Sequence, residues 1–288
     1  MKAIYKHEMA SCFHTLSGYI FISFLLFFAG IFTYAYNLHG GYASFQNVLG
    51  GITFVFLVIV PILTMRSFAE EKHQKTDTLL YSLPVKMPQV VLGKFFALVT
   101  ILAMALAVVA LIPLLLSAYG NVNMASSYGA LIGFLFLGAA LISVGLFTSS
   151  LTDSQAVSAG VCFLLLLVNY FLSSLSQYAS STSAAALLLS TVLVIMIALL
   201  FWMMTRSSYI SVLVGLVLEA VLLALYVINK DWFSNTVPSI MKKLSLFDSY
   251  NTLLNGVFDF TVIVYFLTVM VFFLFLTVQS MEKRRWSD

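Results

Sequence analysis

Long apolar runs, each about as long as a lipid bilayer is thick, constrain this chain more than any other feature. A membrane-spanning helix needs about 20 mostly apolar residues, and in lipid only helices or closed barrels satisfy their backbone hydrogen bonds. The runs here are continuous rather than alternating, which favours helices over a barrel. We predict eight spans, over residues 16–36, 48–65, 88–117, 128–149, 156–173, 184–204, 208–228 and 260–280. Pro113 is predicted to kink the third span near its far end.

Composition agrees with this prediction. Of the 288 residues, 61% are hydrophobic and 9% charged, whereas about a quarter of the residues of a soluble domain are charged. The predicted fold class is therefore all-α, a polytopic helical membrane protein with a single transmembrane domain over residues 1–288. A six-span alternative, with residues 184–228 lying flat or re-entrant, keeps the two termini on one side. That stretch is apolar and long enough to span, so we prefer eight spans.

The segments outside the spans are predicted to lie on the membrane surface. Residues 1–15 resemble a short interfacial helix, and no small-residue cleavage site follows, so we expect no cleaved signal peptide. Residues 229–259 are predicted to form surface or re-entrant helices on the outer side, with Pro238 starting one helix and Asp248 capping a second.

The distribution of basic residues predicts the orientation of the chain. Cytoplasmic segments of membrane proteins carry an excess of Lys and Arg. The eight-span arrangement leaves three basic residues outside and eleven in the cytoplasm, so both termini are predicted to be cytoplasmic. The outer three are Lys230, Lys242 and Lys243, and the inner eleven are Lys2, Lys6, Arg66, Lys72, Lys75, Lys86, Lys94, Arg206, Lys283, Arg284 and Arg285.

One polar segment between the second and third spans is predicted to bind a partner. We call residues 66–87 the elbow. Residues 66–75 can extend the second span beyond the membrane with opposite charges at close spacing. Thr76 or Asp77 then caps a short helix over residues 78–83, which Pro84 ends. A solvated loop that only turns the chain is the alternative, and the capping signals and the shared face of Leu79, Leu80 and Leu83 favour a docking surface.

Several functions that depend on recognisable motifs are disfavoured. The chain has no Gly-x-x-x-x-Gly-Lys-Ser/Thr phosphate loop. Glu70, Glu71 and His73 resemble part of an intramembrane protease site, but none of the four histidines falls within a predicted span. Cys12 and Cys162 support neither a disulfide framework nor a metal site. Nothing indicates nucleic-acid binding.

Polar residues within the apolar runs have two readings. Glu219 lies midway along the seventh span, where an ionised carboxylate is costly. It is either a proton or substrate contact or, as we prefer, a protonated or hydrogen-bonded carboxyl between helices. Asn169 and Gln177 are predicted to form interhelical hydrogen bonds.

Several blocks together resemble the permease subunits of type-2 ATP-binding-cassette (ABC) transporters, especially the gliding-motility-type branch. The most specific block is PILTMRSFAEE at residues 61–71. The others are TDTLLYSLPV at 76–85, VLGK at 91–94, GLFTSSLTDSQ at 145–155, NGVFD at 255–259 and RRW at 284–286.

The resemblance implies that the elbow docks in a groove of a separate ATPase subunit, present in two copies. It implies ATPase-coupling positions at Arg66, Glu70, Glu71, Thr78, Leu79, Leu80 and Leu83, and a second cytoplasmic turn near that partner with Thr152, Asp153 and Gln155. A second permease, identical or related, and membrane lipids complete the expected partners. ATP binds to the ATPase, and no cofactor is expected on this chain.

Two departures from the family pattern stand out. Lys75 occupies a position where the family commonly has glycine, which bears on the turn geometry of the elbow. The family pattern has six spans, so residues 184–228, with Glu219, are predicted to be an accessory pair added to the six-span core.

The function that the resemblance implies is that of the permease subunit of an ABC exporter in the cell membrane, with no enzyme activity of its own. The alternatives are an ATPase-coupled subunit with a mechanical or signalling role that transports nothing and, least favoured, an intramembrane enzyme.

Overall fold

A computed structural model describes residues 1–76, 86–179, 183–205, 208–228, 230–255 and 259–287. Its described elements are all helical, and eight helices are long and apolar enough to cross a membrane. Both the fold class and the number of spans match the sequence prediction. The chain divides into two compact units, one of residues 1–166 and 249–288 (unit 1) and one of residues 167–248 (unit 2).

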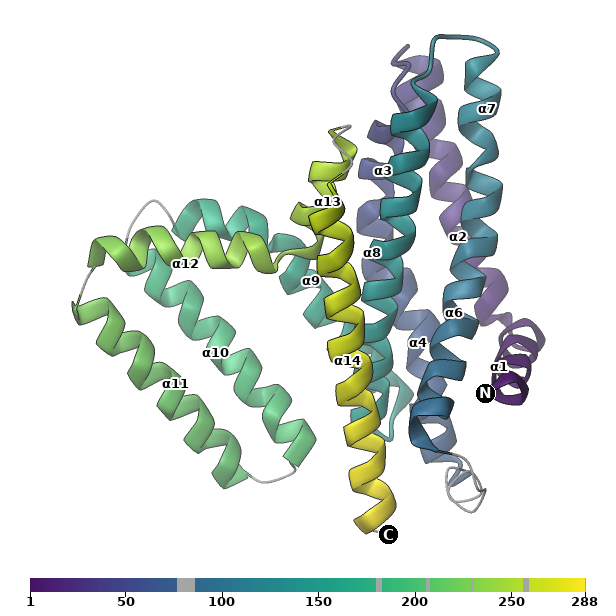
Figure 1. Cartoon of the computed structure of the whole chain (residues 1–288). Coiled ribbons are helices and arrows are strands. Elements are labelled where there is room, and N and C mark those ends of the chain that lie inside the picture. The colour runs from purple at the N-terminus through teal and green to yellow at the C-terminus, as the bar shows by residue number, and fades with distance from the viewer. Residues whose placement is uncertain (77–85, 180–182, 206–207, 229, 256–258, 288) are drawn as a thin grey trace. The chain divides into compact units, whose positions relative to one another are not determined.

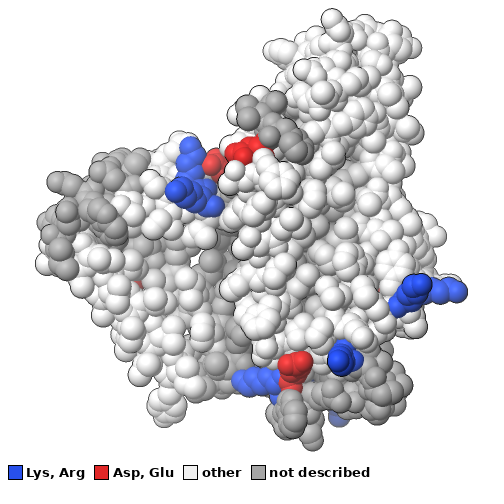
Figure 2. Space-filling model, in the orientation of Figure 1, with Lys and Arg blue, Asp and Glu red and all other residues white. Residues whose placement is uncertain are grey.

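Unit 1 holds five of the eight spans and the first half of a sixth, Gln155–Gln177. Its elements are α1 (Lys2–His14), α2 (Leu16–Phe32), the π-helical η1 (Thr33–His39), α3 (Gln46–Ile52), the 3₁₀ turn η2 (Thr53–Val55), α4 (Phe56–His73), α6 (Met87–Val109), α7 (Leu111–Ser117), α8 (Met124–Leu151), the first half of α9 (Gln155–Ala179), the end of α13 (Leu246–Leu254) and α14 (Phe260–Ser287). Charged side chains form only a few small clusters on the surface visible in Figure 2.

Helix α8 is the centre of unit 1. In its most apolar window, 83% of the residues are buried within the chain. It packs against α4, α6 and α14, which surround it in Figure 1. Gly145 is where α8 approaches α4 most closely, because a Cβ atom built there would lie 2.3 Å from Oγ1 of Thr64. The α4–α8 packing therefore requires glycine at this position.

Pro113 divides the third span, as its position in the sequence predicts. Helix α6 ends at Val109, and α7 begins at Leu111. Proline lacks a backbone N–H, and its ring clashes with the carbonyl four residues earlier. That carbonyl belongs to Val109, so the helical hydrogen bonding is interrupted there.

Several predicted helix ends are wrong because polar side chains were read as loop. Helix α8 begins at Met124 rather than 128, since Asn123 caps it by accepting a hydrogen bond from the Ser126 N–H at 3.2 Å. The predicted link over residues 173–183 is helical as far as Ala179. The hydroxyl of Ser176 bonds to the Ser173 carbonyl at 2.6 Å, so it is satisfied within the helix.

Unit 2 contains the second half of α9, α10 (Ser183–Thr205), α11 (Ser208–Ile228), α12 (Lys230–Leu244) and the start of α13. Asn169 makes the predicted interhelical contact: its Nδ2 donates to the Leu244 carbonyl, and its Oδ1 accepts from the Leu246 N–H, each at 3.0 Å. Gln177 takes part in an interaction, but its partner is not described.

Two predictions for the segment over residues 229–259 are corrected. Pro238 lies inside α12, which begins eight residues earlier at Lys230, so it does not start the helix. Asp248 is in the first turn of α13 rather than at its cap. The hydroxyl of Ser245 accepts the Asp248 N–H at 3.1 Å and so caps the helix.

Candidate functional site

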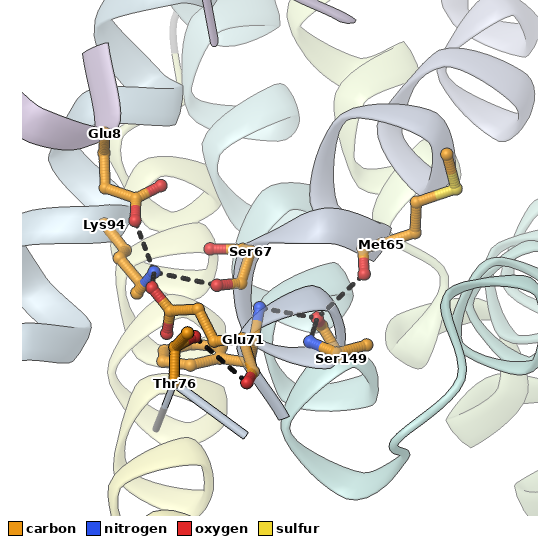
Figure 3. Close-up of polar contacts among 9 residues, drawn as sticks. Glu8, Met65, Ser67, Glu71, Thr76, Lys94 and Ser149 are labelled. Carbon is orange, nitrogen blue, oxygen red and sulfur yellow. Dashed lines mark hydrogen bonds and ion pairs between the residues drawn. The ribbon is translucent and has the colours of Figure 1, made fainter. Parts of the chain in front are cut away.

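A single buried lysine joins three helices of unit 1. Lys94, in α6, is 1% exposed, and its ammonium group donates to Glu8 in α1. It also donates to two acceptors in α4, the Ser67 carbonyl at 2.8 Å and Oε1 of Glu71 at 2.7 Å. Figure 3 shows these groups converging on the nitrogen. All three protons of the ammonium group therefore have an acceptor.

Neighbouring contacts hold the N-terminal helix against α6. The Tyr5 hydroxyl donates to Oγ1 of Thr100 at 3.1 Å. Gly93 lies under Ile4, whose Cγ2 would be 3.1 Å from a Cβ atom at that glycine. The sequence prediction of a helix over residues 1–15 is confirmed, and Glu8 on its inner face is buried. Helix α1 therefore packs on α6 through Ile4 and Tyr5 as well as through the buried Glu8 carboxylate.

The charges of this cluster do not cancel within it. One ammonium group faces two carboxylates, and among the described residues neither Oε2 of Glu71 nor Oγ of Ser67 has a hydrogen-bond partner, although both atoms are buried. Both residues line a cavity of about 620 Å³ together with His7, Glu8, Arg66 and Glu70. Arg66 and Glu70 form the predicted i,i+4 ion pair, with Nε 3.3 Å from Oε2. The cavity is thus a polar recess able to receive polar groups of another molecule.

A second set of polar contacts fastens α4 to α8. The hydroxyl oxygen of Ser149 accepts from the N–H groups of Phe68 and Ala69 at 3.0 and 3.1 Å (Figure 3). The Lys72 ammonium donates to the carbonyl of Ser150, which also accepts from the Ser280 hydroxyl of α14 at 3.2 Å. The end of α4 that lies in the elbow is therefore hydrogen-bonded to α6 and α8, and Lys94 of α6 links it to α1.

The predicted second turn is shorter than expected. Residues 149–151 still belong to α8 and Gln155 is the first residue of α9, so the turn consists of residues 152–154. Oδ1 of Asp153 accepts from Nη1 of Arg284 in α14 at 2.5 Å. Thr152 is buried. The turn is thus tied to the C-terminal helix.

This geometry can be set beside known families. Residues 15–213 match the family described as ABC-2 family transporter protein, which is more than half of the chain. The chain belongs to this family. Comparison with curated proteins and with solved structures gives no match. The matched range includes α10 and the start of α11, so it does not separate the predicted accessory pair from the rest of the family sequence.

Membership makes this chain a permease-type, multi-pass membrane protein. ABC-2 membrane proteins are typically non-catalytic and generally pair with ATPase subunits. Among the residues that the structure describes, no group of three or more His, Cys, Asp or Glu side chains could hold a metal ion.

The structure brings together only part of the predicted coupling set of this ABC-2 transporter protein. Arg66, Glu70 and Glu71 line one recess. Thr78, Leu79, Leu80 and Leu83 lie outside the described residues, as do the cap at Asp77 and the stop at Pro84. Glu219 belongs to unit 2.

Glu71 has a second role inside the chain. Its carboxylate accepts a hydrogen bond from the buried Lys94 at 2.7 Å and also lines the recess. Lys94 and Glu8 are not among the residues predicted for the site. A signal for them exists: Lys94 follows the apolar residues 90–92 and precedes Phe95 and Phe96, and a lysine buried in such a helix needs an acidic partner.

The end of α4 forms a turn that favours glycine at the position occupied by Lys75. Lys75 has a φ angle of +57° and follows the C-cap residue Gln74. The Thr76 N–H bonds to the Glu71 carbonyl at 2.9 Å and the Lys75 N–H to the Lys72 carbonyl at 3.1 Å. This is the Schellman arrangement, which favours glycine at the left-handed position. The turn geometry is therefore the one for which glycine is suited.

We expect that Lys75→Gly stabilises the folded chain by about 1 kcal/mol, because glycine adopts the left-handed conformation without steric cost. Thermal unfolding of the purified protein in detergent measures the effect. Gln74→Gly is the matched control and should destabilise, since Gln74 has a φ of −82° that any residue adopts. A lower unfolding temperature for Lys75→Gly than for the unchanged protein would contradict the assigned turn.

Proposed function

We propose that this chain is the permease subunit of an ABC exporter of the gliding-motility-type branch, located in the cell membrane with both termini in the cytoplasm. Two separate ATPase subunits bind and hydrolyse ATP, and a second permease, identical or related, completes the pathway. Family membership supports the permease role. The sequence blocks given above support the branch, and the distribution of Lys and Arg supports the orientation.

One observation carries the proposal: the end of α4 that lies in the elbow is hydrogen-bonded to α6 and α8 and, through Lys94 of α6, linked to α1. Lys94 bonds Glu71 and the Ser67 carbonyl of α4 and also Glu8 of α1, while Ser149 of α8 bonds the α4 backbone. A force applied to the elbow therefore moves α4 together with α1 and α6 rather than bending its last turn.

In the proposed mechanism, closure of the ATPases on ATP displaces the elbow and tilts α4 and α6. The permease then shifts between two states of different access. Nucleotide binding can drive this shift only if it stabilises one state more than the other. The polar recess that the elbow residues Arg66, Glu70 and Glu71 help to line is the part of the surface that we assign to contact with the ATPase.

Charge reversal at Glu70 tests the contact. Glu71 is unsuitable, since its carboxylate serves Lys94 inside the permease. Glu70 contacts only residues one turn away among those described, Arg66 and Gln74, and the Glu70 and Arg66 side chains are about one third exposed (30% and 37%). We expect that Glu70→Lys lowers the ATPase activity recovered with the affinity-purified chain by about tenfold or more, the effect of one misplaced charge at an interface.

Lys243→Glu is the matched control, because it reverses one exposed charge on α12, in a segment predicted to lie outside the cell. It should leave the recovered ATPase activity unchanged. Equal recovery of ATPase activity with Glu70→Lys and with the unchanged chain, at equal expression, would count against the assigned contact.

A further inference from the structure

The pair α10 and α11 encloses a groove that the proposed ATPase coupling does not use. The two helices form an antiparallel pair within unit 2, joined through residues 206–207 (Figure 1). They meet closely where a Cβ atom at Gly215 would lie 3.3 Å from Cβ of Ala198, and the Ser211 hydroxyl donates to the Ala198 carbonyl at 3.0 Å. Beside this contact lies a groove of about 580 Å³.

The walls of the groove are apolar, and the two ends differ. Val194, Ile195, Leu199 and Leu216 are among the lining residues. Trp202 lies four residues beyond Ala198 on α10, and Glu219 lies four residues beyond Gly215 on α11. Because the helices are antiparallel, Trp202 and Glu219 lie on opposite sides of the Ala198–Gly215 contact along the groove. Four residues on each side, at 1.5 Å per residue, separate them by about 12 Å along the helix axes. An indole thus marks one end and a carboxylate the other.

Glu219 is the one carboxylate among the residues that line the groove. Within the described residues its carboxylate has no hydrogen bond or ion pair. The two hydroxyl groups that line the groove donate to backbone carbonyls, Thr191 to Leu188 at 2.8 Å and Ser211 to Ala198 at 3.0 Å. A carboxylate in the middle of a 19-residue span is costly unless it is paired or protonated.

The groove lies between two apolar spans that bury little of their surface. In the two spans, Ala186–Met203 and Tyr209–Val227, only 17% and 6% of the residues are buried. On the groove itself Ile195 is 58% exposed and Leu216 66% exposed. An occupant therefore reaches the groove from within the bilayer.

These features select the chemistry of the occupant. A metal ion needs several oxygen ligands, and the groove offers one carboxylate. A neutral lipid leaves that carboxylate unpaired, and an anionic lipid is repelled by it. A molecule with one ammonium group and an apolar body of about 12 Å or more satisfies both the charge and the walls, and the indole of Trp202 adds a favourable aromatic surface.

We propose that the groove between α10 and α11 is a binding site for a membrane-soluble amine, with its ammonium group on Glu219 and its apolar body along the walls toward Trp202. The site is independent of the ATPase contact, so failure of either proposal leaves the other unaffected.

Photo-crosslinking tests the site with the full chain in phosphatidylcholine vesicles. The probe is hexadecylamine carrying a photoreactive diazirine on its alkyl chain, and the comparison probe is the matching hexadecanol. We expect that the amine labels α10 and α11 about tenfold more than the alcohol, because an ion pair shielded from water is among the stronger polar contacts. Glu219→Gln should reduce amine labelling to the level of the alcohol.

Two further variants complete the test. Glu282→Gln removes a carboxylate from α14, outside the groove, and should label like the unchanged chain. Ile195→Trp fills the groove but keeps the Glu219 carboxylate, so it should abolish amine labelling of both helices. This variant tests the site even if Glu219→Gln does not fold. Equal labelling by amine and alcohol, or labelling unaffected by both groove variants, overturns the proposal. The proposal is also overturned if the amine does not label the groove and Glu219→Gln changes the oligomeric state of the chain. The groove would then be covered by a second copy of the chain.

Discussion

Replacing Lys94 with methionine is expected to destabilise the folded chain by about 3–5 kcal/mol, the cost of leaving a buried charge without its partner. Methionine keeps the apolar volume of the side chain but leaves the Glu8 and Glu71 carboxylates facing one another. The Ser67 carbonyl also loses its lysine donor. Thermal unfolding in detergent measures the loss, and Lys243→Met, at an exposed residue of α12, is the matched control that should leave stability unchanged.

A triple variant separates stability from coupling. Adding Glu8→Gln and Glu71→Gln to Lys94→Met removes the unpaired buried charges, which are the main cause of the destabilisation. We expect the triple variant to unfold near the temperature of the unchanged protein. The charged link between α1, α4 and α6 is still absent, so ATP-dependent activity of the complex should stay low. Full stability of Lys94→Met alone would show that the cluster does not hold the helices together.

Gly145→Ala is expected to destabilise by about 1–3 kcal/mol, the usual cost of overpacking a filled core. The added Cβ atom would lie 2.3 Å from Oγ1 of Thr64 and 2.8 Å from its Cβ atom, so α8 must move away from α4. That movement also strains the hydrogen bonds of Ser149 to the α4 backbone. Thermal unfolding of the purified protein is again the measurement.

Gly160→Ala is the matched control, because nothing lies within 4 Å of a Cβ atom at Gly160 of α9. There alanine should stabilise by about 0.5–1 kcal/mol through its better helix propensity. Adding Thr64→Ala to Gly145→Ala removes the closest contact but keeps the Cβ atom, so recovery should be partial. If Gly145→Ala were as stable as Gly160→Ala, the close α4–α8 packing would be incorrect.

The parts of the fold that depend on local chemistry were predictable. Apolar runs of bilayer length gave the eight spans, and Pro113 gave the break between α6 and α7 because its effect reaches only four residues back. The extension of α4 beyond Met65 followed from the i,i+4 pair of Arg66 and Glu70. Each of these signals lies within one or two helical turns.

The contact of Lys94 with Glu8, which is central to the site, was not predictable from local sequence signals. Lys94 and Glu8 are 86 residues apart, and no periodicity in one sequence indicates which acidic residue a buried lysine meets. The errors at helix ends have a related cause. Asn123 and Ser245 cap helices through hydrogen bonds that depend on backbone geometry, and the neighbouring polar residues look like loop in the sequence.

The central claim is that the elbow is moved from the cytoplasm, and cysteine labelling in intact cells tests it most directly. The natural thiols give little background, because Cys12 and Cys162 are buried and burial raises the pKa of the Cys12 thiol to about 11. Gln74→Cys places a thiol within the elbow, at the exposed end of α4. Tyr119→Cys places one after α7, at the other end of the third span, where the side chain is 90% exposed.

A membrane-impermeant maleimide is applied to cells before and after permeabilisation. The account predicts that the Tyr119→Cys variant is labelled in intact cells and that the Gln74→Cys variant is labelled only after permeabilisation. Labelling of the Gln74→Cys variant in intact cells would place the elbow outside and contradict the account.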